Sequence, residues 1–227
     1  MIRELEAIDA CVFDAYGTLF DVAAAAARCR DDLHGKAEAL AEVWRTKQLQ
    51  YTWLRSLMRR YVDFTQVTGD ALDYALAAVG IDDPPLRERL MGLYMELDAY
   101  PEVPEMLRRL RTGGLKTGIL TNGSPRMIDA AVASAGIGDL LDAVLTVDPL
   151  GIYKPDPSVY RLAPDHFGVP VERIAFMSSN AWDAAGAADF GMRVVWINRF
   201  GQPPERLPGT PVAELTSLEG LPELLGV

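Results

Sequence analysis

The chain has 227 residues and a mass of 24.9 kDa, with 49% hydrophobic, 24% charged and 8% aromatic residues. This composition supplies enough apolar surface for a packed core and excludes a disordered or low-complexity polymer. The 32 acidic residues outnumber the 22 basic ones, and the formal net charge of −10 makes nucleic acid and anionic membranes poor partners. No apolar run reaches the roughly 18 residues of a spanning helix, and the charged N-terminal segment is unlike a signal peptide. We therefore expect a cytoplasmic protein.

Cysteine and histidine are too scarce to organise the fold or a metal site. Cys11 and Cys29 cannot form a disulfide framework, and His34 and His166 have no Cys/His cluster around them. Cys11 lies within an apolar segment, which favours a role in the core over a role as a nucleophile.

Five short apolar segments are predicted to be strands, at residues 10–13, 115–120, 143–147, 174–177 and 193–197. From the second strand onward, helix-compatible segments separate them, a pattern typical of right-handed βαβ units around a parallel sheet. Ser124 before Pro125 and Asp156 before Pro157 mark two helix starts. The sequence therefore predicts an α/β fold with a doubly wound parallel sheet.

The interval between the first two strands has no strand signal and is predicted to be helical throughout. The expected helices cover residues 23–27, 36–61, 70–79 and 86–97, with breaks at Gly35, Gly69 and Pro84-Pro85. Further along the chain, Pro164 is expected to kink or end the helix that contains it. The tail after Phe200 is expected to be loop with a short closing helix.

Polar residues follow four of the predicted strands directly or after a loop. They lie in the segments Asp14 to Thr18, Thr121 to Ser124, Tyr153 to Pro157 and Ser178 to Asp183. Ligands of doubly wound sheets bind outside the carboxyl ends of the strands, so these segments should meet at one edge. Each has an ordinary interpretation as a turn, a cap or a solvated loop charge. Together they offer a nucleophile, hydrogen-bond donors and a balancing cation.

These residues resemble the four motifs of the haloacid dehalogenase superfamily. The closest resemblance is to the L-2-haloacid dehalogenases, in the segments FDAYGTLFD at 13–21, WRTKQLQYTW at 44–53, YKPD at 153–156 and SSNAWD at 178–183. It spans nearly the whole chain. It implies a Rossmann-like core of residues 1–20 and 98–227, with a helical cap subdomain at 21–97.

Most members of that superfamily are magnesium-dependent phosphohydrolases, and two of their carboxylates are absent here. The second acid of their Asp-x-Asp motif is Tyr16, and a magnesium ligand usually found four residues before Asp183 is Ser179. Magnesium prefers oxygen ligands and has a poor site in such a set. A halide, unlike an alkoxide, leaves without a proton donor. We therefore expect carbon–halogen hydrolysis without a metal or cofactor.

The resemblance implies a two-step reaction on an L-2-haloacid. Asp14, ionised at neutral pH, displaces the halide from C2 with inversion and forms an ester. Water then attacks the Asp14 carbonyl carbon and releases a D-2-hydroxyacid. Lys154 would keep Asp14 ionised. Asp183, Asn180 and Lys154 are the candidates for activating the water; Asp183 is the preferred base, and its alternative role is to fix the charge of Lys154.

The resemblance also assigns the remaining site residues. The expected catalytic set is Asp14, Thr18, Arg45, Lys154, Ser178, Asn180 and Asp183. The expected substrate-binding set is Ala15, Tyr16, Leu49, Phe64, Thr121, Asn122, Tyr160 and Trp182. Arg45 and Asn122 would hold the halide, whereas Thr121 and nearby main-chain N–H groups would bind the substrate carboxylate. Thr121 stands where relatives usually carry serine, and its extra methyl group could limit substrate size.

Three classes of function follow from these observations. The first is a cofactor-free hydrolase of short 2-haloacids, and the second is a magnesium-dependent phosphatase of small esters. The third is a catalytically silent interaction protein, which should have lost Asp14 or Lys154; both are present. The resemblance also implies a homodimer, for which Met58 and Tyr61 are candidate interface residues, although intramolecular packing explains them equally well.

Overall fold

The computed structural model describes residues 3–22, 33 and 35–227. Its centre is a six-stranded sheet in the order β3-β2-β1-β4-β5-β6, and every neighbouring pair is parallel. The strands are β1 (Ala10–Phe13), β2 (Lys116–Thr121), β3 (Ala143–Thr146), β4 (Ile174–Ser178), β5 (Arg193–Ile197) and β6 (Ala213–Leu215). The predicted doubly wound α/β fold is confirmed. β6 was not predicted, because three partly exposed residues at a sheet edge carry almost no hydrophobic pattern.

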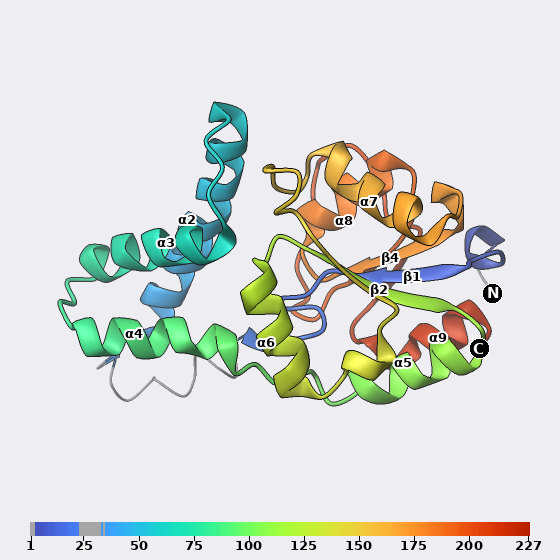
Figure 1. Ribbon diagram of the computed structural model, residues 1–227, viewed down its shortest axis with the longest axis horizontal. Helices are drawn as coiled ribbons and strands as arrows, with labels where there is room; N and C mark the ends of the chain where they lie inside the picture. The colour runs from blue at the N-terminus through green and yellow to red at the C-terminus, as the bar shows by residue number, and fades with distance from the viewer. Residues whose placement is uncertain (1–2, 23–32, 34) are drawn as a thin grey trace.

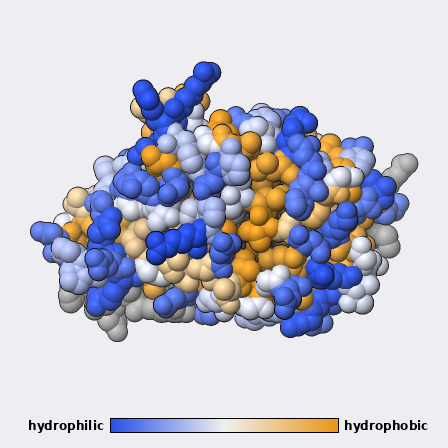
Figure 2. Space-filling view, viewed as in Figure 1, coloured by the Kyte–Doolittle hydropathy of each residue, from blue (hydrophilic) through white to orange (hydrophobic). Residues whose placement is uncertain are grey.

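Helices cover both faces of the sheet. They are α5 (Val103–Thr112), α6 (Pro125–Ala135), α7 (Pro157–Phe167), α8 (Ala181–Phe190) and α9 (Leu221–Leu225). Figure 1 shows α7 and α8 on one side of the strands and α5 and α9 on the other. The central strands β1 and β4 are accordingly buried along their lengths. On the surface of the molecule drawn in Figure 2, apolar side chains gather near the middle. Cys11 is fully buried in β1, where burial raises the pKa of its thiol, so it packs as a core residue; Cys29 lies outside the described residues.

The helix ends carry the expected caps. Ser124 accepts a hydrogen bond from the N–H of Met127 at the start of α6, and Asp156 accepts one from Ser158 at the start of α7. Of the two expected effects of Pro164, an end to the helix is wrong, because α7 continues to Phe167, and a kink stays a prediction. The proline lies in the last turn, where its missing N–H removes a single intrahelical bond.

A helical insertion separates β1 from β2 and lies beside the sheet in Figure 1. It contains α2 (Ala37–Met58), α3 (Phe64–Ala78), α4 (Pro84–Gly92) and a 3₁₀ turn (Leu93–Met95). The predicted break at Gly69 is wrong. Gly69 lies inside α3, where an added Cβ would lie 3.2 Å from Arg87 Nη2 on α4, so the glycine leaves room for the guanidinium that pairs with Asp73. The predicted helix at 23–27 lies outside the described residues.

The two crossings between the core and the insertion lie side by side. Phe20 forms a bridge with Ala99, and Tyr100 N donates to Leu19 O over 2.9 Å. Arg199, in the turn after β5, stabilises this junction, because its Nη2 lies 3.0 Å from Thr18 O and 2.7 Å from Glu102 Oε1. The insertion is thus anchored next to the carboxyl end of β1. No helix among the residues described combines the length and apolarity needed to span a bilayer.

Candidate active site

Asp14 lies where β1 ends, and residues that follow β1, β3 and β4 surround its carboxylate. Its backbone N–H continues the pairing with β4 by donating to Met177 O over 2.9 Å. Lys154 Nζ lies 3.1 Å from Oδ1, whereas Asn180 Nδ2 donates to Oδ2 over 2.7 Å. The hydroxyls of Thr18 and Ser178 lie 3.4 and 3.5 Å from Oδ2. With only 7% of Asp14 exposed, this carboxylate is held by donors on both oxygens.

Lys154 is an ammonium buried between two carboxylates. Its Nζ lies 2.9 Å from Asp183 Oδ2 as well as 3.1 Å from Asp14, and only 1% of its side chain is exposed. Burial by itself lowers the pKa of Lys154, but the attraction of Asp14 and Asp183 outweighs burial and raises the pKa above its ordinary value. The site therefore has its own fixed positive charge.

Asp183 is fully buried in the first turn of α8. Burial raises the pKa of Asp183, and neighbouring Asp14 adds to this effect, against the opposing influence of Lys154. Tyr160 donates a hydrogen bond to Asp183 Oδ1 over 2.8 Å. A raised pKa makes a carboxylate a stronger base, which favours the assignment of Asp183 as the proton acceptor.

Tyr160 lies next to Asp183. It was expected to bind substrate, but it is fully buried on α7 and is absent from the lining of the cavity beside Asp14. Its hydroxyl faces Asp183, and burial raises its pKa well above the ordinary value, so it stays a donor. The contact that the structure shows is with Asp183, and a contact of Tyr160 with substrate stays a prediction.

Arg45 reaches the site from α2 of the insertion. Its Nη2 donates to Asn180 Oδ1 over 2.8 Å, and its Nη1 donates to Gln48 Oε1 over the same distance. Asn180 therefore links the guanidinium to Asp14. Gln48 was missed in the sequence, although a signal existed: the buried face of α2 repeats every four residues, at Leu40, Trp44, Gln48 and Thr52, and Gln48 interrupts an otherwise largely apolar row.

A cavity of about 460 Å³ lies between the insertion and the core. Its lining includes Tyr16, Trp44, Arg45, Leu49, Asn180 and Trp182. The buried Tyr16 hydroxyl and Trp182 Nε1 have no hydrogen-bond partner among the described residues. Burial raises the pKa of Tyr16, so its phenol stays a neutral donor. A lining that combines aromatic side chains with unpaired donors suits a small molecule that is part apolar and part anionic.

Several predicted binding residues lie behind this cavity and not on its wall. Phe64 is 3% exposed and stacks on the Tyr16 ring with centroids 6.1 Å apart, so it supports Tyr16 from α3. Thr121 Oγ1 accepts from Gly123 N over 3.0 Å, and Asn122 Oδ1 accepts from Lys154 N over 3.0 Å. The carbonyl of Ala15 closes the turn after β1. Direct contacts of these residues with substrate or halide stay predictions.

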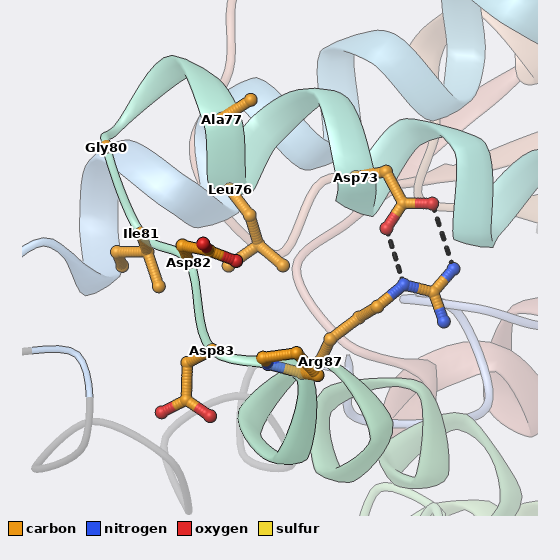
Figure 3. Close-up of a pocket in the computed structure, with 9 residues that line it drawn as sticks. Asp73, Leu76, Ala77, Gly80, Ile81, Asp82, Asp83 and Arg87 are labelled. Atoms are coloured by element: carbon orange, nitrogen blue, oxygen red, sulfur yellow. Dashed lines mark hydrogen bonds and ion pairs between the residues drawn. The ribbon is translucent and has the colours of Figure 1, made fainter.

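A second hollow, of about 570 Å³, lies at the turn between α3 and α4 (Figure 3). The residues drawn there include three aspartates, but Asp73 is paired with Arg87 and Asp83 caps α4 at Leu86 N. The strand-end residues are absent from its lining. Asp73 and Asp83 thus stabilise the insertion, and the candidate active site is the cavity beside Asp14.

No three His, Cys, Asp or Glu side chains within the described part of the chain are placed to share a metal ion. The two carboxylates that approach each other, Asp14 and Asp183, have the Lys154 ammonium between them. The Lys154 ammonium therefore supplies positive charge next to the Asp14 carboxylate.

A family model described as haloacid dehalogenase-like hydrolase matches residues 8–191, which include all the site residues named above. The chain belongs to the haloacid dehalogenase-like hydrolases. This match confirms the resemblance inferred from the four motifs. The matched residues include the insertion between β1 and β2.

Individual relatives match this haloacid dehalogenase-like hydrolase over almost its full length. The (S)-2-haloacid dehalogenase of Pseudomonas sp. (strain YL) is 48% identical over 97% of this chain and 95% of its own. The haloacetate dehalogenase H-2 of Moraxella sp. (strain B) is 38% identical over 98% and 100%. Among solved structures, the L-2-haloacid dehalogenase from Xanthobacter autotrophicus with chloropropionic acid covalently bound is 37% identical and has a TM-score of 0.89. That match covers 96% of this chain and 98% of the other.

Proposed function

We propose that this enzyme hydrolyses short L-2-haloacids to D-2-hydroxyacids through an ester on Asp14. The observation that carries the proposal is the surroundings of the Asp14 carboxylate. One oxygen faces the buried Lys154 ammonium, and the other is held by Asn180, which also contacts Arg45. The names of the relatives, which specify 2-haloacids and haloacetate, and the chloropropionic acid bound covalently to one of them support the same reaction.

In the first step an Asp14 oxygen attacks C2 and the carbon–halogen bond breaks, which inverts C2. The halide takes the bonding electrons, and Arg45 stabilises its developing charge from the cavity wall. The Tyr16 hydroxyl is a donor without a partner among the described residues, and it suits an oxygen of the substrate carboxylate or the halide. The aromatic walls exclude water during the attack.

In the second step water attacks the carbonyl carbon of the Asp14 ester. Lys154 lies 3.1 Å from Asp14 Oδ1, so its ammonium stabilises the oxyanion if this oxygen becomes the ester carbonyl. Asp183 accepts the proton from water, and its raised pKa suits that role. Asp183 passes this proton to the departing oxygen of the hydroxyacid, and Asp14 releases the second proton of the water to solvent, which regenerates its carboxylate.

The insertion acts as a cap on this site. We place its boundaries at residues 21 and 97, with the core formed by 1–20 and 98–227, because the chain crosses at the paired residues Phe20 and Ala99. The cap supplies Arg45 and Leu49 to the cavity wall, and the core supplies Asp14, Lys154 and Asp183 next to the cavity, where Asn180 joins Asp14 to Arg45. The cytoplasmic location stays a prediction.

Halide release tests the proposal against the phosphatase alternative. We expect chloride release from L-2-chloropropionate but not from the D isomer, at the same rate with and without EDTA. Magnesium-dependent release of phosphate from p-nitrophenyl phosphate, without chloride release from either isomer, would favour the phosphatase.

We also propose that the enzyme is a homodimer that pairs through α2. The outer face of α2 exposes 50% of Leu54, 81% of Leu57 and 67% of Met58. Such a row of apolar side chains on a projecting helix suits a second copy of the same helix. Tyr61 is less suited to the interface than its sequence position indicated, because it packs on Tyr153 within the chain. Leu57→Glu should give a monomer in analytical ultracentrifugation, whereas Leu207→Glu, at a 49% exposed loop residue, should not.

A further inference from the structure

Gln48 is a fully buried carboxamide whose donors and acceptor are all in use. Its Oε1 accepts from Arg45 Nη1 over 2.8 Å, and its Nε2 donates to Thr68 Oγ1 over 2.9 Å and to Tyr94 OH over 3.3 Å. A carboxamide is costly to bury, and it is tolerated in a core only when its hydrogen bonds are made. From these contacts we propose that Gln48 is the positioning residue that sets the orientation of the Arg45 guanidinium for halide departure.

The orientation of the Gln48 carboxamide is itself determined by α3. The hydroxyl of Thr68 donates to Phe64 O over 2.6 Å, so it presents only lone pairs to Gln48. The Gln48 NH₂ group must face Thr68, which turns its carbonyl oxygen toward Arg45. Trp44 Nε1 donates to Thr68 O over 3.0 Å and fixes the same turn of α3 against α2.

Arg45 is consequently held from two sides. Gln48 binds Nη1 and the core residue Asn180 binds Nη2, each over 2.8 Å. A guanidinium has five N–H donors in a rigid plane, so two fixed contacts orient the other N–H groups beside the cavity that Arg45 lines. The side chain of Arg45 has several rotatable bonds, and without Gln48 it would be fixed at one side only.

The chemical type of residue 48 also matters. A neutral carbonyl oxygen holds the guanidinium without cancelling its charge. A carboxylate in the same place would pair with Arg45 and weaken the positive field available to a departing halide. Gln48 thus orients the Arg45 guanidinium and leaves its positive charge available to the departing halide.

This inference rests on the proposed function, in which Arg45 stabilises the halide, and the first test uses Gln48→Met, which keeps the length of the side chain. Halide release is measured in single turnovers on L-2-chloropropionate and L-2-bromopropionate. We expect about a tenfold loss of rate for chloride, a smaller loss for bromide, which is the better leaving group, and a KM within about threefold of the wild type. Gln50→Met, the same change at a partly exposed residue of α2, should stay within about twofold.

A double-mutant cycle separates positioning from general loss of structure. In an Arg45→Met background, Gln48→Met should change the rate by less than about twofold, because the group it positions is gone. If Gln48→Met fails to fold, the pair Thr68→Val and Thr68→Ser replaces it. Thr68→Val removes the acceptor that orients Gln48 and should slow chloride release by about fivefold, and Thr68→Ser should restore the rate.

The outcomes that overturn the proposal are distinct. Wild-type rates in Gln48→Met, or equal losses for both halides that persist in the Arg45→Met background, would overturn the role of Gln48 alone. An Arg45→Met enzyme as fast as the wild type would overturn the halide role of Arg45 and this inference with it. Absence of halide release from the wild type would overturn the proposed function itself.

Discussion

Arg45 of α2 donates a hydrogen bond from Nη2 to Asn180 Oδ1 over 2.8 Å, although the two residues are 135 positions apart in the sequence. The opposite end of the same carboxamide donates to Asp14 Oδ2 over 2.7 Å. One asparagine therefore joins the cation proposed for the leaving group to the carboxylate proposed as the nucleophile. It also joins the helical insertion to the core.

This geometry makes Arg45 more than a source of charge. Arg45→Lys keeps the charge but loses the planar group that spans Gln48 and Asn180, so we expect slower chloride release than in the wild type, by about tenfold or more. Arg45→Ala should be slower still, because no cation remains. Chloride and bromide electrodes can follow halide release by both variants from the chloro and bromo substrates. Equal rates for Arg45→Ala and the wild type with both halides would remove Arg45 from the reaction.

Asp14→Asn should abolish halide release, because a neutral amide is not an effective nucleophile toward C2. Its fold should be little changed, since the amide has nearly the shape of the carboxylate. Circular dichroism and thermal unfolding provide the control, and mass spectrometry must show that the asparagine has not deamidated. Turnover by a homogeneous, intact variant would contradict the assignment of the nucleophile.

Lys154→Met should destabilise the enzyme by about 3–5 kcal/mol at pH 7, because it leaves two buried carboxylates without their cation. The folded-state pKa of Lys154 is raised above its ordinary value of 10.5, so its contribution to stability is complete below that pH and is lost as the pH rises through the raised pKa. Urea unfolding of both proteins should give a constant difference from about pH 7 to about pH 10 and a smaller one only above 10.5. If the difference vanishes by pH 9, the Lys154 ammonium loses its proton at a lower pH than its ion pairs with Asp14 and Asp183 predict.

Gly186→Ala should destabilise the enzyme although alanine is the better helix former. An added Cβ in α8 would lie 2.6 Å from the Tyr160 hydroxyl and 2.9 Å from Pro155 Cβ, which would disturb the donor to Asp183. We expect a loss of about 1–3 kcal/mol in unfolding free energy from this overpacking. Gly92→Ala, at an exposed position of α4 with open space around it, should gain about 0.4–1 kcal/mol in the same urea titration. A gain at both positions would show that α8 has room to move away from Tyr160.

Much of the fold was predictable because strands and strand ends carry strong local signals. The residues around Asp14, Lys154 and Asp183 follow apolar segments, and the parallel topology alone brings such ends to one edge. Gly69 and Pro164 misled the prediction, since helix propensity is overridden by the packing of α3 on α4 and by the position of the proline in a last turn.

The depth of each residue behind the cavity could not be predicted. Phe64 and Tyr160 were assigned to the substrate, yet the structure places the first behind Tyr16 and the second behind Asp183. Which side chain faces the cavity and which lies behind it depends on how α3 and α7 pack on their neighbours, and local sequence patterns do not encode this packing. Gln48 was overlooked for the opposite reason, because a polar residue on a helix is usually solvated.

A single turnover in water enriched in oxygen-18, with enzyme in excess over L-2-chloropropionate, tests the covalent route through Asp14 most directly. We expect the first D-lactate to carry an unlabelled hydroxyl oxygen, taken from Asp14, and the peptide containing Asp14 to gain the heavy isotope. Heavy oxygen in the first product, with none in that peptide, would mean that water attacks C2 directly and that no ester forms on Asp14.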